Sequence, residues 1–396
     1  MRVLAFNEGN LGSHVMGQGQ LEHALRAGQA GTGIEVTFTT MAPMGRWANA
    51  LASRPVPLLR ERRLDLPQLR WHVVQSRRAE LALRKALSST PADVVLLHTQ
   101  AVSLGMRRLM TNQPVAISMD TTIADWAAMP AWKETHRLAP AAIRPSRALE
   151  RRSLERASIV LAWTPWAQRA AAAEAPGARV ISHHPGIDVA RYRPAPREPR
   201  ERPRILFVGG RFAEKGGADL LKALEGRLGD TVELDVVTPA DVAERPGLRV
   251  HRLGPSDERL LRLHQQADIF CLPSHGDAAP WAVLEAMACG TAIIASSVGG
   301  IPDLLGDGDA GLLVSPGQPR AIGEALASLI DDGARRDATA AAGRARAERH
   351  YDARRQFATM TSTFETALAD QLDTRRRTTT NSSRGSNARS PMSKAG

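Results

Sequence analysis

The chain has 396 residues, of which 43% are hydrophobic, and its formal net charge is +11. That length suffices for two or three domains with substantial cores, and no apolar run approaches the length that crosses a bilayer. Its two cysteines exclude a disulfide framework and a cysteine-rich metal site.

The basic charge indicates an anionic partner, and nucleotide diphosphates, anionic lipid and nucleic acid all qualify. Aromatic residues make up only 4% of the chain, and no nucleic-acid-binding module is recognisable, so no nucleic acid is expected. The first residues resemble a strand and a glycine-rich loop rather than a signal peptide, which predicts a cytoplasmic chain.

The chain opens with an apolar strand, Arg2 to Phe6, and a loop that contains Gly9 and Gly12. A helix is expected from about Gln20 to Ala27. A glycine loop between a first strand and a first helix lets the backbone approach a phosphate closely. The spacing does not match a dinucleotide-binding fingerprint, so an ordinary flexible turn remains an equal alternative.

Two later apolar runs each end in a polar side chain. Residues 92–99 form a predicted strand that ends near His98, and residues 114–120 form one that ends in Asp120. Polar residues at successive strand ends predict the ligand-binding edge of a parallel sheet. A buried core histidine is as good an explanation of His98. Trp126 and Trp132 follow, and they either stack on a sugar or fill the core.

The segment from Arg46 to Lys85 is strongly basic, with ten basic and three acidic residues. Trp47 and Trp71 lie within it, and Arg60, Arg62 and Arg63 form a cluster. Such a surface suits an anionic membrane face. A solvated, arginine-rich face is the simpler interpretation, and the sequence favours it slightly.

Residues 195–203 are rich in proline and charge, which is typical of a domain boundary. A strand, Arg204 to Val208, follows and leads into a glycine turn that carries Arg211 and Lys215. An arginine offers a planar fork to two phosphate oxygens, and a lysine offers a mobile point charge.

The stretch from Cys271 to Leu305 predicts strand, loop, helix, strand and loop. Asp277 lies in the first loop, and Glu285 lies eight residues later within the helix. The helix directs its positive N-terminus at the carboxyl edge of the sheet, so phosphates could bind there and the two carboxylates could bind hydroxyls. Gly299-Gly300 closes the second strand.

This stretch resembles the signature of the family 4 retaining glycosyltransferases, which have the two-Rossmann GT-B fold. The matching residues are Asp277, Glu285, Ala286-Met287-Ala288, Gly290 and Gly299-Gly300. Arg211 and Lys215 match the family's donor-phosphate motif, and residues 185–194 are similar to its closing motif. Two departures stand out: Asp277 replaces the usual Glu, and Asp120 occupies the place of a histidine.

The resemblance implies an α/β fold with two doubly wound parallel-sheet domains that face a cleft. It implies sugar transfer from a nucleotide-diphosphate-sugar donor, with retention of configuration and without a metal or other cofactor. The expected divisions are an acceptor-side domain over 1–194, a linker over 195–203, a donor-binding domain over 204–350, a helix over 351–373 that crosses back, and a disordered basic tail over 374–396.

The resemblance also assigns roles to the candidate residues. Donor binding is expected of Arg211, Lys215, Glu285, Gly9, Gly12, Gly299 and Gly300, and chemistry of Asp120, His98 and Asp277. His183-His184 lacks further ligands at metal spacing, and Asp307-Gly308-Asp309 is interpreted as a turn. Two alternatives stay open, a sugar-nucleotide epimerase of the same fold and a non-catalytic anion-binding protein.

Overall fold

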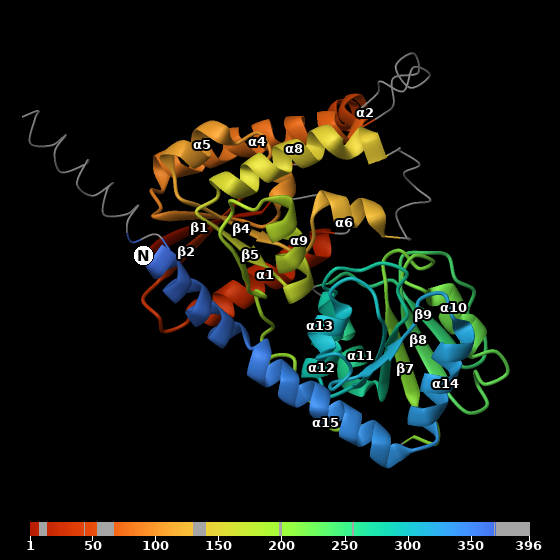
Figure 1. Cartoon of the computed structure of the whole chain (residues 1–396). Helices are drawn as coiled ribbons and strands as arrows, with labels where there is room; N and C mark the ends of the chain where they lie inside the picture. Colours follow the sequence, from red (N-terminus) through yellow and green to blue (C-terminus); the bar gives the residue numbers. More distant parts are fainter. Residues whose placement is uncertain are drawn as a thin grey trace, which may run out of the picture.

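The computed structural model describes residues 1–7, 14–42, 44–53, 67–129, 140–197, 200–255, 257–367 and 369. These residues form two lobes, each built on a six-stranded parallel sheet (Figure 1). Some expectations fall outside the described residues: those on Gly9 and Gly12, on Arg60, Arg62 and Arg63, on Trp132, and on the tail over 374–396.

The first sheet has the strand order β2-β1-β3-β4-β5-β6. Its strands are β1 (Arg2–Asn7), β2 (Glu35–Thr40), β3 (Val94–Leu97), β4 (Val115–Met119), β5 (Ile159–Ala162) and β6 (Val180–Ser182). The central strands β3, β4 and β5 are buried along their whole length, as expected of parallel strands covered on both faces.

Successive side chains of β1 enter different cores. Leu4 and Phe6 pack on one face of the sheet, and Val3 and Ala5 pack on the other, because side chains alternate along a strand. The first lobe's helices are α1 (His14–Gln29), α2 (Arg46–Ser53), α4 (Pro67–Ser89), α5 (Arg107–Asn112), α6 (Ile123–Ala128), α8 (Pro140–Arg156) and α9 (Pro165–Glu174), with a 3-10 turn η1 (Gln100–Val102).

The second sheet has the order β12-β11-β10-β7-β8-β9. Its strands are β7 (Arg204–Val208), β8 (Glu233–Val237), β9 (Leu248–His251), β10 (Ile269–Leu272), β11 (Ala292–Ser296) and β12 (Leu312–Val314). The direction of winding reverses between β7 and β10, and a crevice opens outside the carboxyl ends of strands at such a point. Its helices are α10 (Gly217–Ala223), α11 (Glu258–Gln266), α12 (Trp281–Ala288), α13 (Ile301–Leu305), α14 (Pro319–Ile330) and α15 (Gly333–His350).

A last helix, over residues 353–367, returns to the first lobe. Figure 1 shows it in blue beyond α15, running along the molecule toward the N-terminus. Phe357, Met360 and Phe364 are buried in the first lobe's core beside Leu25, whereas Tyr351 belongs to the second lobe's core. This helix therefore crosses back from the second lobe to the first, and each buried phenylalanine stabilises the crossing by about 1.5–3 kcal/mol.

The start of this crossover approaches the segment that follows β6. The amide of Ile187 donates to the carbonyl of Tyr351 at 2.6 Å, and the amide of Ala353 donates to the carbonyl of Ile187 at 2.9 Å. Gly186 has φ +92°, and a Cβ there would lie 2.7 Å from the Cα of Ala353. Only glycine fits this close approach without strain.

Some expected boundaries differ from the structure. Helix α1 begins at His14 rather than near Gln20. Glycine in a helix interior costs only about 0.5–1 kcal/mol, and burial of Ala24 and Leu25 offsets it. The N-cap of α11 is Asp257, whose carboxylate accepts from the amide of Arg259. Within the described ranges, no helix is long and apolar enough to span a membrane.

Candidate functional site

A cavity of about 500 Å³ lies between the two lobes. First-lobe residues from the ends of β3 and β4 and from α6 line one wall, and second-lobe residues from the loops after β7 and β10 line the other. Its lining includes His98, Asp120, Thr121, Trp126, Arg211, Lys215, Asp277, Trp281 and Glu285. The cavity therefore sits where the carboxyl edges of both sheets meet, which is where doubly wound folds bind ligands.

In the second lobe, the loops after β7 and β10 touch. A Cβ on Gly216, which has φ +77°, would lie 1.9 Å from the carbonyl oxygen of Pro273. This contact brings the Lys215 ammonium against the Asp277 carboxylate, and the two form an ion pair. Arg211 stands beside them, 41% exposed, and its Nη1 donates to Glu214 Oε2 at 2.9 Å. The site thus presents two cations to the cavity.

Helix α12 points its N-terminus into the same cavity. Its N-cap is Pro280, and no side chain caps the helix, so its first amides keep their hydrogen-bonding capacity for a ligand. Trp281 and Ala282, the first residues of the helix, line the cavity. Uncapped amides at a helix N-terminus favour an anion, and here they add to the charge of Arg211 and Lys215.

Glu285 lies one turn further along α12 and is only 4% exposed. The hydroxyl of Tyr192 donates to its Oε1 at 3.3 Å, and Nε2 of His264 lies 3.2 Å from its Oε2. Tyr192 comes from the segment before β7 and His264 from α11, and the Tyr192 hydrogen bond helps to hold the carboxylate at the cavity wall. Neither contact was predicted from the sequence. Tyr192 lies within the closing motif, but nothing in the local sequence connects His264 to Glu285.

Gly299 and Gly300 are not among the residues that line the cavity, although the sequence predicted donor binding for them. They lie behind the loop that carries Asp277. A Cβ on Gly299, which has φ +55°, would lie 1.9 Å from the Asp277 carbonyl oxygen, and one on Gly300 would lie 2.3 Å from that of Ala278. Their role in this structure is to let two backbones approach closely.

In the first lobe, His98 and Asp120 reach the same cavity wall, as their strand-end positions predicted. His98 is 3% exposed, and its ring stacks on Trp163 with 5.4 Å between the centroids. The Trp163 indole donates to Ser118 Oγ at 2.7 Å. The packing explanation of His98 and the functional one are therefore both compatible with its position.

Metal binding has no support from the described part of the chain, in which no three His, Cys, Asp or Glu side chains cluster as ligands would. His184 Nδ1 accepts from the amide of Gly186 at 2.9 Å, and burial lowers the pKa of His184 to about 3. His183 lies 2.9 Å from the carbonyl of Gln356. Asp307-Gly308-Asp309 forms a turn before β12, as predicted.

Residues 188–346 match the family model described as glycosyl transferases group 1. A D-inositol 3-phosphate glycosyltransferase of Xylanimonas cellulosilytica is 34% identical over 166 residues, which cover 38% of this chain and 39% of that protein. A glycogen synthase of Mycobacterium tuberculosis is 33% identical over 181 residues, which cover 42% of this chain and 44% of that protein. The chain spans less than half the length of these curated relatives.

Solved structures resemble the whole chain. Sucrose-phosphate synthase from Thermosynechococcus elongatus superposes with a TM-score of 0.71 over 93% of this chain and 99% of that one, at 16% identity. Anabaena HepE, in complex with UDP and glucose, superposes with a TM-score of 0.64 over 92% of this chain and 100% of that one, at 17% identity. At these identities the likeness shows the two-lobed GT-B fold, and it extends beyond the region that the family model matches.

Proposed function

We propose that this chain, whose residues 188–346 match the glycosyl transferases group 1, moves a sugar from a nucleotide-diphosphate-sugar donor to an acceptor. The observation that carries the proposal is the second-lobe wall of the cavity. There two cations, an uncapped helix N-terminus and a buried carboxylate that accepts from Tyr192 converge within one site.

Each group in this wall matches one part of the donor. Arg211, Lys215 and the amides of α12 would neutralise the diphosphate as it leaves, which is the charge stabilisation that a metal ion supplies in other sites. The Glu285 carboxylate would accept hydrogen bonds from the ribose hydroxyls. Asp277 would do the same for the sugar, after exchanging part of its contact with Lys215 for the substrate.

The first-lobe wall would receive the acceptor. Asp120 is placed to stabilise positive charge at the anomeric carbon or to take the acceptor proton, and His98 to donate a hydrogen bond. We propose retention of configuration and metal independence, in line with the family 4 resemblance.

A donor screen tests this function. The purified chain is incubated with UDP-, GDP- and ADP-sugars, and nucleotide release is measured. Nucleotide should be released from sugar donors that carry one of these bases. The rate of release should fall about tenfold to a hundredfold in Arg211→Ala and in Lys215→Ala, since each substitution removes a charge-assisted contact of roughly 1.5–3 kcal/mol. Lys222→Ala is the matched control, because Lys222 is exposed on α10 away from the cavity.

The same screen separates the alternatives. Wild-type kinetics in both cavity variants would place the diphosphate elsewhere. A sugar-nucleotide epimerase would give an epimerised donor or free sugar without transfer. A non-catalytic anion-binding protein would bind nucleotides and release nothing.

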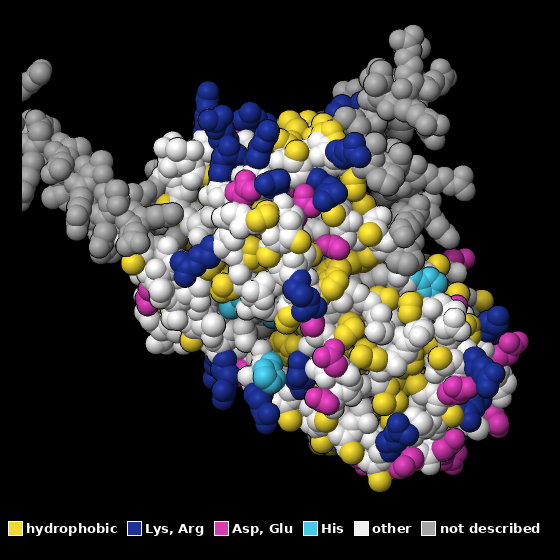
Figure 2. Space-filling view, viewed as in Figure 1, with side chains coloured by type: hydrophobic (Ala, Val, Ile, Leu, Met, Phe, Trp, Pro, Cys, Tyr) yellow, Lys and Arg dark blue, Asp and Glu magenta, His cyan; other side chains and the backbone are white. Residues whose placement is uncertain are grey.

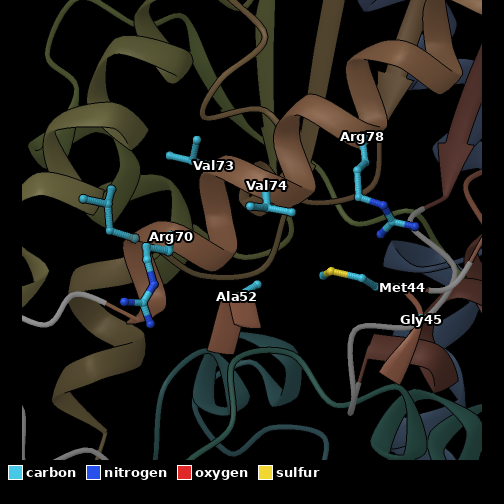
Figure 3. A pocket seen from close by; sticks show the side chains of 8 residues that line it. Met44, Gly45, Ala52, Arg70, Val73, Val74 and Arg78 are labelled. Atoms are coloured by element: carbon cyan, nitrogen blue, oxygen red, sulfur yellow. The ribbon is translucent and has the colours of Figure 1, made fainter. Parts of the chain in front are cut away.

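We further propose that the first lobe docks on an anionic membrane surface through α2 and α4. The exposed large hydrophobic side chains of the described residues all lie on these helices: Trp47 (87% exposed), Leu81 (67%), Val73 and Val74 (38% each). A cavity of about 640 Å³ lies between the helices, and Figure 3 shows Val74 and Ala52 there, between Arg70 on one side and Arg78 on the other.

Basic side chains surround this apolar patch. Figure 2 shows Lys and Arg gathered over the outer face of the first lobe, whereas both signs of charge mix on the second lobe. Arg84 and Lys85 are exposed on α4, and each cation near an anionic surface adds about 1 kcal/mol of attraction. Apolar side chains ringed by cations fit anionic lipid better than they fit nucleic acid.

Vesicle co-sedimentation tests the docking. The chain should bind phosphatidylglycerol vesicles at low salt and release them as salt rises, because the attraction is screened over about 8 Å at physiological ionic strength. Trp47→Ser with Leu81→Ser should abolish binding, and Arg320→Ser, exposed on α14 in the second lobe, should not. A chain ended at Asp373 must be included, because residues 374–396 are basic and could bind lipid alone. If that shorter chain ignores the vesicles, the docking surface is not on this lobe.

A further inference from the structure

A carboxylic acid is buried behind the first-lobe wall of the cavity. Glu150 lies on α8, is 0% exposed and does not line the cavity. The amide of Ile123, the first residue of α6, donates to its Oε1 at 3.0 Å and lies 3.2 Å from its Oε2. Nε2 of Gln100 donates to the same Oε1 at 3.2 Å. A buried carboxyl with these partners is unusual, because side chains of this type are rarely buried without a defined role.

Gln100 connects Glu150 on α8 to the loops that follow β3 and β4. Its Nε2 also donates to the carbonyl of Thr121 at 2.7 Å, in the loop after β4. Its Oε1 accepts from the hydroxyl of Thr99 at 3.2 Å, in the loop after β3. Thr99 has φ +148°, a backbone conformation that costs energy in a β-branched residue and persists only when surrounding contacts hold it.

These contacts converge on the residues that line the cavity. Thr99 is next to His98, Thr121 is next to Asp120, and α6 carries Trp126. We propose that Glu150 is a positioning residue that holds the loop after β3, the loop after β4 and α6 in one arrangement, and so sets the acceptor side of the cavity. Its effect on transfer rests on the proposed function, whereas its effect on these three segments does not.

The protonation state of Glu150 gives a signature that packing alone would not produce. Burial raises the pKa of Glu150 to about 8, and the nearby Glu174 on α9 adds to this, whereas the Ile123 amide, Gln100 and Arg147 oppose it. The charged groups near Glu150 have hydrogen-bond partners of their own. Arg147 donates to Glu174 at 2.6 Å and 3.0 Å, and Asp125 on α6 accepts from Thr122 at 2.6 Å.

The sign of the pH effect follows from the two pKa values. The folded carboxyl keeps its proton up to about pH 8, whereas the unfolded one loses it near the ordinary glutamate pKa of 4.5. Unfolding therefore releases a proton between these values, and the stability that the buried neutral acid allows falls as pH rises through this window. Glutamine has the shape of the neutral acid and does not titrate, so Glu150→Gln should have a flatter pH dependence of Tm.

Hydrogen exchange followed by mass spectrometry tests the positioning role without any substrate. In Glu150→Ala the Ile123 amide loses its acceptor, and exchange in peptides covering 119–128 should rise at least tenfold. Glu150→Gln should stay within twofold of the native chain at pH 7, where the native acid is largely neutral. Glu155→Ala is the matched control, because Glu155 lies on the same helix but is exposed.

Kinetics supply the second readout. With the donor identified by nucleotide release, Glu150→Ala should lower turnover at least tenfold while affinity for the nucleoside diphosphate of that donor, measured by calorimetry, stays within twofold. Unchanged exchange in Glu150→Ala overturns the proposal, as does an equal loss of nucleotide binding and turnover. If Glu150→Ala does not fold, the Tm of Glu150→Gln between pH 5 and 8 decides: a slope equal to that of the native chain overturns it. Altered exchange in a chain that turns over no donor would refute the proposed function and leave the positioning role intact.

Discussion

The two walls of the cavity are built in different ways. In the second lobe, Arg211 and Lys215 lie four residues apart on one loop, and Asp277 and Glu285 lie eight apart on one loop and helix. In the first lobe, His98 and Asp120 come from separate strands and are held through Gln100 and Glu150, which are 50 residues apart. The second-lobe wall is made from local motifs, so it can be recognised in the sequence, and substitutions within the motifs should disrupt it. The first-lobe wall depends on contacts between distant residues, so substitutions of residues that do not line the cavity should also disrupt it.

The largest loss of activity should come from a substitution in the first-lobe wall of the cavity. Asp120→Asn keeps the shape and removes the charge, so if Asp120 takes the acceptor proton or stabilises the anomeric centre, kcat should fall a hundredfold or more. Nucleotide binding should be unchanged, because the donor's diphosphate contacts the other wall. Steady-state kinetics together with calorimetry measure both. A fall of less than threefold would mean that Asp120 only lines the cavity.

Replacing a glycine that packs against the backbone of the Asp277 loop should disrupt the second-lobe wall. Gly299→Ala places a Cβ 1.9 Å from the Asp277 carbonyl oxygen at a φ of +55°. The backbone conformation alone costs about 1–3 kcal/mol, and the clash must also displace Asp277. We expect a lower Tm and a raised donor KM. Gly317→Ala is the control, since its φ is +67° but no atom lies within 4 Å of its Cβ. Equal effects on donor KM in both variants would show that the approach to Asp277 is irrelevant.

A smaller effect tests how Glu285 is held. Tyr192→Phe removes only the hydroxyl that donates to Glu285 at 3.3 Å. A typical hydrogen bond contributes about 0.5–1.5 kcal/mol, so donor KM should rise roughly twofold to tenfold with kcat little changed. Titration of the nucleotide by calorimetry checks the binding part. An unchanged affinity would mean that His264 and the helix backbone fix Glu285 on their own.

The smallest expected effect is none. Excess chelator should leave turnover unchanged, because Arg211, Lys215 and the α12 amides would supply the positive charge at the diphosphate. The rate of nucleotide release with and without EDTA measures this. Loss of activity that manganese or magnesium restores would refute the metal-free mechanism.

Sequence patterns predicted most of the architecture. The strand from Arg204 to Val208 was placed at the residues where the structure has it, and the helix that carries Glu285 was expected between two strands, as α12 is. Both follow from local signals: a buried apolar run, and a helix that begins after a proline. Asp277, Lys215 and Glu285 were expected at one cleft because each sits at a strand end or at the helix that follows.

What the sequence could not predict depends on contacts between distant residues. Tyr192 meets Glu285 across 93 residues, and Glu150 meets Ile123 across 27. Neither pair has a spacing rule, because only the completed fold brings the partners together. Donor binding by Gly299-Gly300, which the family resemblance implied, stays a prediction. The close approach of these glycines to the backbone of the Asp277 loop was not predicted, because it too depends on the completed fold.

The returning helix over residues 353–367 also constrains the order in which a nascent chain can finish folding. Strand β1 leaves the ribosome well before this helix, and the core around Val3 and Ala5 is completed by Phe357 and Phe364, which are translated more than 350 residues later. The second lobe has its own core and can fold before that helix emerges. During synthesis the first lobe therefore keeps part of an apolar sheet face uncovered until the last helix emerges, and exposed apolar surface of this kind favours aggregation.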